Sequence, residues 1–131
     1  MVVHGECIDL GCAEGLIAID EGQIIGLVTY RIQGREMEIL SLDSVREGMG
    51  IGTLLLSEAI GVAKHEGCTK IVLTTTNDNT VALAFYQKRG FDIVRIRRNA
   101  LDIARQIKPE IPLTGENGIP LRHEIDLEMA V

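Results

Sequence analysis

The chain has 131 residues, 46% of them hydrophobic and 24% charged, so it is long enough for one domain with a core and is neither disordered nor fibrous in composition. Its net charge of −6 argues against nucleic acid as the main partner, because a phosphate backbone attracts a basic surface. It lacks both an apolar run of about 18 residues, which would span a bilayer, and a signal-peptide pattern. We therefore predict a cytoplasmic protein without a membrane partner. The odd number of cysteines, at positions 7, 12 and 68, fits reduced thiols, and their spacing predicts no metal site.

Alternating hydrophobic residues and turn signals predict three antiparallel strands in the first third of the chain. They cover residues 15–20, 23–32 and 36–42, with turns at 21–22 and 33–35. Residues 1–14 are weakly patterned, and no element is predicted there. From residue 51 to residue 66 the hydrophobic positions follow a helical period, and Gly67 is a typical helix stop.

The rest of the chain predicts further strands separated by helices. Residues 70–76 form a strand that lies parallel to strand 36–42, because a helix connects the two. A helix follows over 80–89, with Asn77, Asp78 and Asn79 available as N-caps. Residues 91–98 predict a strand in which either both faces are covered or a bulge intervenes. A helix over 100–108 and a last strand over 123–129 complete an α/β fold: one domain over residues 1–131, with a mixed, mostly antiparallel central sheet and crossover helices.

A glycine-rich run, REGMGIGT at positions 46–53, leads directly into the helix that begins at residue 51. Alternate glycines let the backbone approach a ligand closely, and a helix N-terminus directs its N–H groups and positive dipole end at an anion. The run lacks the lysine of a nucleoside-triphosphate loop, and it lacks the G-x-G-x-x-G spacing and downstream acid of a dinucleotide site. It predicts a phosphate-binding loop of another kind, with a purely structural turn as the alternative.

Three motifs in this order resemble the GCN5-related N-acetyltransferase (GNAT) family. They are EGMGIG at 47–52, NTVALAFY at 79–86 and KRGF at 88–91. The resemblance covers about residues 15–96 and implies the acyl-CoA N-acyltransferase fold, with acetyl-CoA as co-substrate. It also implies an enzyme that transfers the acetyl group to an acceptor amine by direct attack in a ternary complex. A non-catalytic acyl-CoA-binding sensor or partner subunit is the alternative.

The resemblance implies where acetyl-CoA binds. The pantetheine arm would pair with the strand backbone at Leu40 and Leu42, and Asn79 would contact the same arm unless it serves only as a helix cap. Glu47 stands where the family usually has Gln or Arg, so we expect backbone N–H groups to hold the pyrophosphate. Arg46 then either supplies positive charge or is an ordinary surface residue. The loop residues assigned to acetyl-CoA are Arg46, Glu47, Gly48, Met49, Gly50, Ile51, Gly52 and Thr53.

The resemblance also implies catalytic roles. Tyr86 matches the tyrosine that hydrogen-bonds the departing sulfur, with core packing as the alternative. A phenol of pKa about 10 protonates a thiolate of about 8.5 at a cost of about 2 kcal/mol, so Tyr86 is either acidified or acts mainly by hydrogen bonding. A general base for the amine would be Glu38 first and Asp43 second, and a solvated carboxylate is the alternative for each.

Members of this family usually begin with a strand and two helices that wall one side of the acceptor groove, whereas here only residues 1–14 precede the first predicted strand. With this shortened N-terminus, the wall is expected from residues 99–120, from a second copy, or from a large acceptor. An uncovered sheet exposes apolar surface, which usually marks an interface. We therefore predict a homodimer through a sheet edge or the first strands, and a small-molecule or peptide amine as acceptor.

Overall fold

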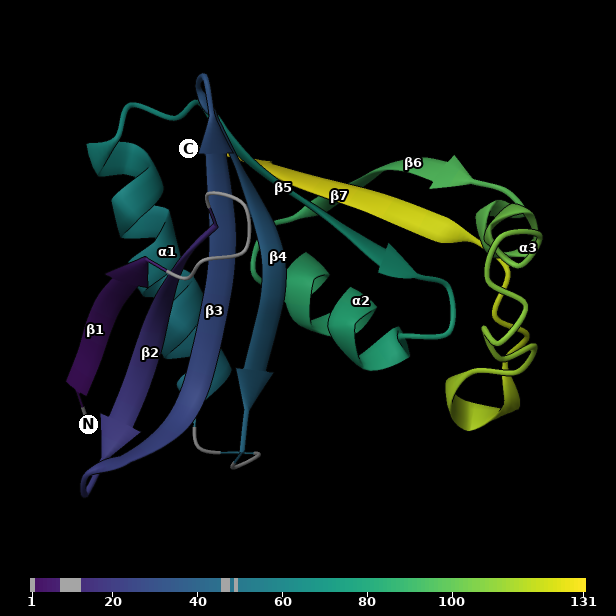
Figure 1. Cartoon of the computed structure of the whole chain (residues 1–131). Helices are drawn as coiled ribbons and strands as arrows, with labels where there is room; N and C mark the ends of the chain where they lie inside the picture. The colour runs from purple at the N-terminus through teal and green to yellow at the C-terminus, as the bar shows by residue number, and fades with distance from the viewer. Residues whose placement is uncertain (1, 8–12, 46–47, 49) are drawn as a thin grey trace. The chain divides into compact units, whose positions relative to one another are not determined.

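The computed structural model describes residues 2–7, 13–45, 48 and 50–131, and within it the chain divides into two compact units. The first unit consists of the chain up to Val72 together with Ala130 and Val131, and the second is Leu73–Met129. Figure 1 labels the helices and strands. In the part of the chain that is described, no helix is both long enough and apolar enough to cross a membrane.

An antiparallel sheet forms the first unit. β1 (Val2–Cys7) pairs with β2 (Glu14–Asp20), β2 with β3 (Gln23–Gln33), and β3 with β4 (Glu36–Ser44). The three predicted strands are confirmed as β2, β3 and β4. β1 is an addition, because its weak sequence pattern predicted no element.

Helix α1 (Ile51–His65) packs on β2, β3 and β4 of this sheet (Figure 1) and confirms the predicted helix. Its buried residues Ile51, Leu55, Ala59 and Ala63 recur every fourth position and so form one stripe. Gly26 of β3 lies beneath this stripe. A Cβ on Gly26 would stand 2.7 Å from Ile51 Cγ2 and 2.9 Å from Leu55 Cδ1. The first turns of α1 therefore sit where β3 has no side chain.

Strand β5 (Lys70–Thr76) follows α1 and is as predicted. The Thr69 N–H donates to the Arg35 carbonyl at 2.7 Å, and the Lys70 ammonium pairs with Glu36 at 3.3 Å. β4 and β5 therefore begin side by side, as expected for parallel strands joined by a crossover helix.

In the second unit the strands lie in the order β5-β7-β6, and α2 (Thr80–Lys88) joins β5 to β6. β6 (Asp92–Arg97) pairs antiparallel with β7 (Glu124–Ala130), and the register slips between Ile93 and Arg95. Val94 is thus the extra residue of a β-bulge, which was one of the two alternatives for this strand. The other alternative, coverage of both faces, is wrong, because Asp92 to Ile96 are all exposed.

Residues 99–123, which lie between β6 and β7, are called the arm below. It contains α3 (Ala100–Ala104) and a short 3-10 turn, η1 (Glu116–Gly118). The predicted helix 100–108 is wrong at its C-terminal end. The N–H groups of Gln106 and Ile107 donate to carbonyls three residues back, at 3.1 and 3.0 Å, so the chain tightens into turns after Ala104.

Replacing Gly26 with alanine is expected to lower the free energy of unfolding by about 1–3 kcal/mol, because the new methyl group overpacks the contact with α1. Gly61→Ala is the matched control, since a Cβ at this helical position meets nothing within 4 Å. We expect Gly61→Ala to raise the stability by up to about 1 kcal/mol through helix propensity. Urea denaturation measures both, and equal effects of the two substitutions would contradict the close approach at Gly26.

Candidate functional site

The N-terminus of α1 is open to an anion. Gly48 and Gly50 have φ of +73° and +72°, a left-handed conformation that favours glycine. Gly50 is the N-cap, so no side chain caps the helix, and the first helical turn holds no acidic residue. Among the described residues, the Leu54 N–H donates to the Gly50 carbonyl at 3.0 Å. The N–H groups at the start of a helix point along its axis toward the N-terminal end, which is the chemistry that a pyrophosphate needs.

Helix α2 offers a contrast, because its N-terminus is closed by its own side chain. Asn79 Oδ1 accepts a hydrogen bond from the Ala82 N–H at 3.1 Å. The predicted cap is thus present, and the oxygen of Asn79 is engaged. For the contact to acetyl-CoA that the resemblance implies, Asn79 still offers its amide nitrogen and the second lone pair of its oxygen.

Strand β4 carries an irregularity at Leu40 that the sequence did not indicate. Ser41 pairs with Thr29 but Ile39 pairs with Tyr30, so Leu40 is an extra residue on β4. The extra residue of a bulge leaves the ladder, and its backbone is then available to another partner. The Leu40 side chain is 43% exposed, whereas Met37 and Ile39 are buried. The backbone contact predicted for Leu40 thus falls on the bulged residue, and Leu42 lies two residues further along the same strand.

The first candidate base, Glu38, is engaged in an ion pair. Its carboxylate accepts from Arg31 Nη2 at 2.5 Å, and the two residues are direct partners across β3 and β4. The second candidate, Asp43, is exposed near the end of β4. To contact an acceptor amine, the Glu38 carboxylate would first have to separate from Arg31.

Tyr86 is held in one orientation by aromatic neighbours. It is 7% exposed, and its ring meets Phe85 and Phe91 edge-on, with centroids 5.2 and 5.3 Å apart. Phe85 is itself covered by the Arg89 guanidinium, 3.8 Å from its ring centroid. Such contacts fix the direction of the phenol.

The structure thus places the predicted residues in two groups. Glu38, Leu40, Leu42, Gly48, Gly50, Ile51, Gly52 and Thr53 belong to the first unit, and Asn79 and Tyr86 belong to the second. Arg46, Glu47 and Met49 lie outside the described residues.

Asp78 is a polar residue whose environment the sequence did not indicate beyond its value as a possible N-cap. It is 6% exposed and accepts hydrogen bonds from Thr76 Oγ1 at 2.5 Å and from the Glu116 N–H at 3.0 Å. Burial acts to raise the pKa of this carboxyl, but the hydrogen bonds outweigh burial and hold the pKa below its usual range. A side chain on Gly115 would collide with the carboxylate. Asp78 and Gly115 therefore fit together as a buried contact between the β5–α2 turn and the arm.

Comparison with known proteins gives a consistent result. A family model described as "Acetyltransferase (GNAT) family" matches residues 6–91. The "Uncharacterized protein YdhI" of Bacillus subtilis (strain 168) is 52% identical over 113 residues, which span 86% of this chain and 71% of that protein. A GNAT family acetyltransferase from Elizabethkingia anophelis, solved with acetyl-CoA bound, is 30% identical, with a TM-score of 0.79 over 91% of this chain and 76% of that one. A Bacillus subtilis acetyltransferase in complex with CoA is 25% identical, with a TM-score of 0.81 over 93% of this chain and 79% of that one.

The Asp78 carboxylate is expected to stabilise the fold in a pH-dependent way. Its pKa is lowered on folding, so its contribution is complete above the unfolded value of 3.8 and is lost as the pH falls through the lower folded value. Asp78→Asn keeps the shape without the charge. The difference in unfolding free energy between the natural protein and Asp78→Asn should therefore be larger at pH 6 than at pH 3, measured by urea denaturation. A difference that does not change with pH would contradict the role of the charge.

Proposed function

The chain belongs to the GNAT family of acetyltransferases, and we propose that it transfers an acetyl group from acetyl-CoA to an acceptor amine by direct attack in a ternary complex. The observation that carries the proposal is the uncapped, acid-free N-terminus of α1 behind two left-handed glycines, at the position of the family's acyl-CoA loop. Acetyl-CoA is bound in a solved relative that is 30% identical to the chain.

In the proposed reaction, the neutral amine attacks the thioester carbonyl carbon, the new C–N bond forms and the C–S bond breaks. The nitrogen loses one proton and the sulfur receives one. The N–H groups of Ile51 and Gly52, at the start of α1, bind the pyrophosphate. The backbone at Leu40 and Leu42 pairs with the pantetheine arm, and an N–H near Leu42 stabilises the oxyanion.

Tyr86 is proposed to hydrogen-bond the sulfur as negative charge develops there. Protonation of the thiolate by an ordinary phenol is uphill by about 2 kcal/mol, so stabilisation by hydrogen bonding is its main effect unless the site acidifies it. Its orientation between Phe85 and Phe91 supports this role.

Deprotonation of the amine is the most demanding step. A lysine-like amine of pKa about 10.4 costs about 4.6 kcal/mol to neutralise at pH 7, so a base or a water chain to one assists. Glu38 is proposed as this base, and it acts after release from Arg31. Asp43, which is exposed, is the second candidate.

We also propose that the protein acts in the cytoplasm and pairs with a second copy of itself. The edge strand β6 supports the pairing, because Ile93, Val94 and Ile96 are 43%, 51% and 57% exposed. Light scattering over a concentration series distinguishes a dimer from a monomer.

Turnover is tested by CoA release from acetyl-CoA in the presence of a panel of amines. Release that depends on one class of amine would identify the acceptor and support an enzyme. Tight binding of acetyl-CoA without release for any amine would instead favour the non-catalytic acyl-CoA-binding alternative.

Gly50→Val is expected to abolish acetyl-CoA binding in calorimetry. The strain of a left-handed residue that is not glycine is about 1–2 kcal/mol, and a β-branched side chain also stands where the ligand approaches. A Cβ at Gly50 meets nothing within 4 Å, so the fold itself should survive. Gly61→Ala, in the middle of α1, should bind normally. Unchanged affinity of Gly50→Val would remove the loop from the site.

Tyr86→Phe is expected to lower kcat by about 10- to 100-fold, the worth of one hydrogen bond to a charged group. The affinity for acetyl-CoA should change little, because the interaction strengthens only as charge develops on sulfur. Tyr30→Phe is the matched control, since Tyr30 is the other tyrosine and is buried on β3. Steady-state kinetics decide the matter, and equal turnover of the two variants would exclude Tyr86 from the chemistry.

A further inference from the structure

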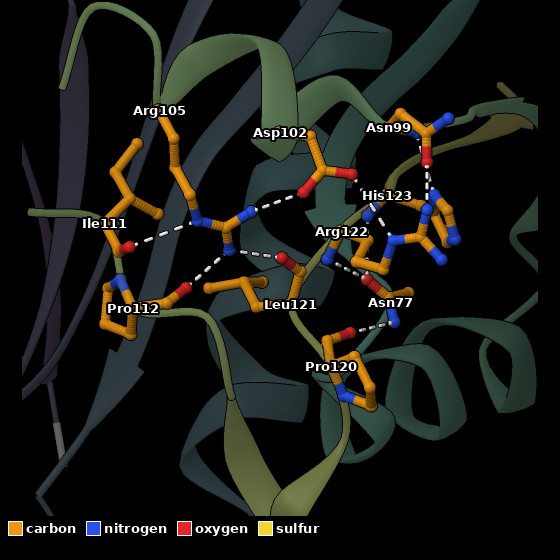
Figure 2. Close-up of polar contacts among 10 residues, drawn as sticks. All are labelled: Asn77, Asn99, Asp102, Arg105, Ile111, Pro112, Pro120, Leu121, Arg122 and His123. Carbon is orange, nitrogen blue, oxygen red and sulfur yellow. Dashed lines mark hydrogen bonds and ion pairs between the residues drawn. The ribbon is translucent and has the colours of Figure 1, made fainter. Parts of the chain in front are cut away.

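Asn77 binds the C-terminal end of the arm with its backbone and with both polar atoms of its side chain. Its Nδ2 donates to the Pro120 carbonyl at 2.9 Å, and its backbone N–H donates to the His123 carbonyl at 3.0 Å. Its Oδ1 accepts from the N–H groups of Arg122 and His123, at 3.0 and 2.8 Å. Figure 2 shows Asn77 pointing into this stretch of backbone. One side chain thus satisfies three main-chain groups that stand 43–46 residues away in the sequence.

Arg105 closes the arm on itself. Its side chain is 11% exposed, and its guanidinium donates to the carbonyls of Ile111, Pro112 and Leu121 and pairs with Asp102 at 2.8 Å (Figure 2). Carbonyls from the middle and the end of the arm therefore converge on one cation.

The two ends of the arm are joined as well. Arg122 donates to Asn99 Oδ1 at 2.7 Å, and the Asn99 N–H donates to His123 Nδ1 at 2.9 Å (Figure 2). Together with Arg105, these bonds make the arm one connected piece. A contact that fixes residues 120–123 therefore fixes the rest of the arm as well.

The same turn that holds the arm begins α2. Asn77 and Asp78 contact the arm, and the next residue, Asn79, caps α2 through the Ala82 N–H. Of the nine residues of α2, all of them described, only Tyr86 is buried. Packing alone therefore fixes this short helix weakly, and its first turn depends on the residues that precede it.

We propose that Asn77 is a positioning residue for acetyl transfer, which ties the arm to the first turn of α2 and so sets where Asn79 and Tyr86 stand. This inference rests on the proposed function. Asp78 reinforces the tie from the neighbouring position, through the Glu116 N–H and the close fit against Gly115. The arm thereby acts on the thioester end of the reaction without touching it.

The test compares Asn77→Ala and Asn77→Asp with the natural protein. Asn77→Ala loses every side-chain bond to the arm, and we expect amide exchange at Ala82 to accelerate by about tenfold and kcat to fall by about tenfold. The affinity for acetyl-CoA should fall by less than kcat does, because the proposed pyrophosphate site at the N-terminus of α1 belongs to the other unit. Asn77→Asp keeps the oxygen that accepts from the N–H groups of Arg122 and His123. Its exchange rate at Ala82 and its kcat should therefore lie between those of Asn77→Ala and those of the natural protein.

Gln87→Ala is the matched control, since this exposed side chain bonds only within α2, to the Leu83 carbonyl at 3.0 Å. It should leave exchange at Ala82 and kcat unchanged. Normal exchange at Ala82 together with normal kcat in Asn77→Ala would overturn the inference. The proposed function would still stand in that case, provided that the natural protein turns over an amine. An equal rise in exchange at Ala59 of α1 would also overturn it, because the effect would then be global. If the wild type turns over no amine, the proposed function fails, and unchanged exchange at Ala82 still refutes the tie.

Discussion

The close contact between Gly26 and the first turns of α1 is the constraint on which the candidate site depends. Ile51 is the first residue of α1, is 1% exposed and lies over Gly26, so the helix begins where β3 has no side chain. Gly50, immediately before it, is left-handed and cannot cap the helix with a side chain. Packing against Gly26 fixes where α1 begins, and the glycine at position 50 leaves that N-terminus without a side-chain cap. Its N–H groups are therefore already oriented before a ligand arrives, which reduces the entropic cost of binding.

The arm is organised by hydrogen bonds to backbone groups rather than by apolar packing. The arm has large exposed aliphatic residues, with Ile103, Ile107 and Leu113 at 60%, 84% and 74% exposure, so apolar burial does little to hold it. Arg105 and Asn77 replace that packing with directional bonds. Such bonds specify one conformation, because each unpaired buried partner costs about 1–3 kcal/mol. This mode of organisation explains why a segment with little regular secondary structure has a defined place against the β5–α2 turn.

Local patterns in the sequence were sufficient for most elements of the fold. The helical period from Ile51 and the apolar centre of residues 70–76 are properties of neighbouring residues, and they predicted α1 and β5 within one residue. The spacing of the glycines likewise indicated the loop at 46–53, whereas the role of Tyr86 was inferred from the resemblance to the family. The bulge at Leu40 was missed because it is a property of the register between two strands. The contacts of Asn77 were missed because they join residues more than 40 positions apart. α3 is shorter than the hydrophobic period over 100–108 predicted, because the chain tightens into turns after Ala104.

The two helices show how the same local chemistry leads to different uses. An asparagine before α2 satisfies the helix with its own oxygen, whereas the glycine before α1 has no side chain with which to cap it. Capping stabilises a helix end by about 1 kcal/mol, so an uncapped end costs that much unless an anion replaces the cap. α1 recovers stability from its buried stripe on β2, β3 and β4, which α2, with Tyr86 alone buried, lacks. The helix with the larger buried face is therefore the one that leaves its N-terminus open, and the helix with the smaller face needs both its cap and the tie from Asn77.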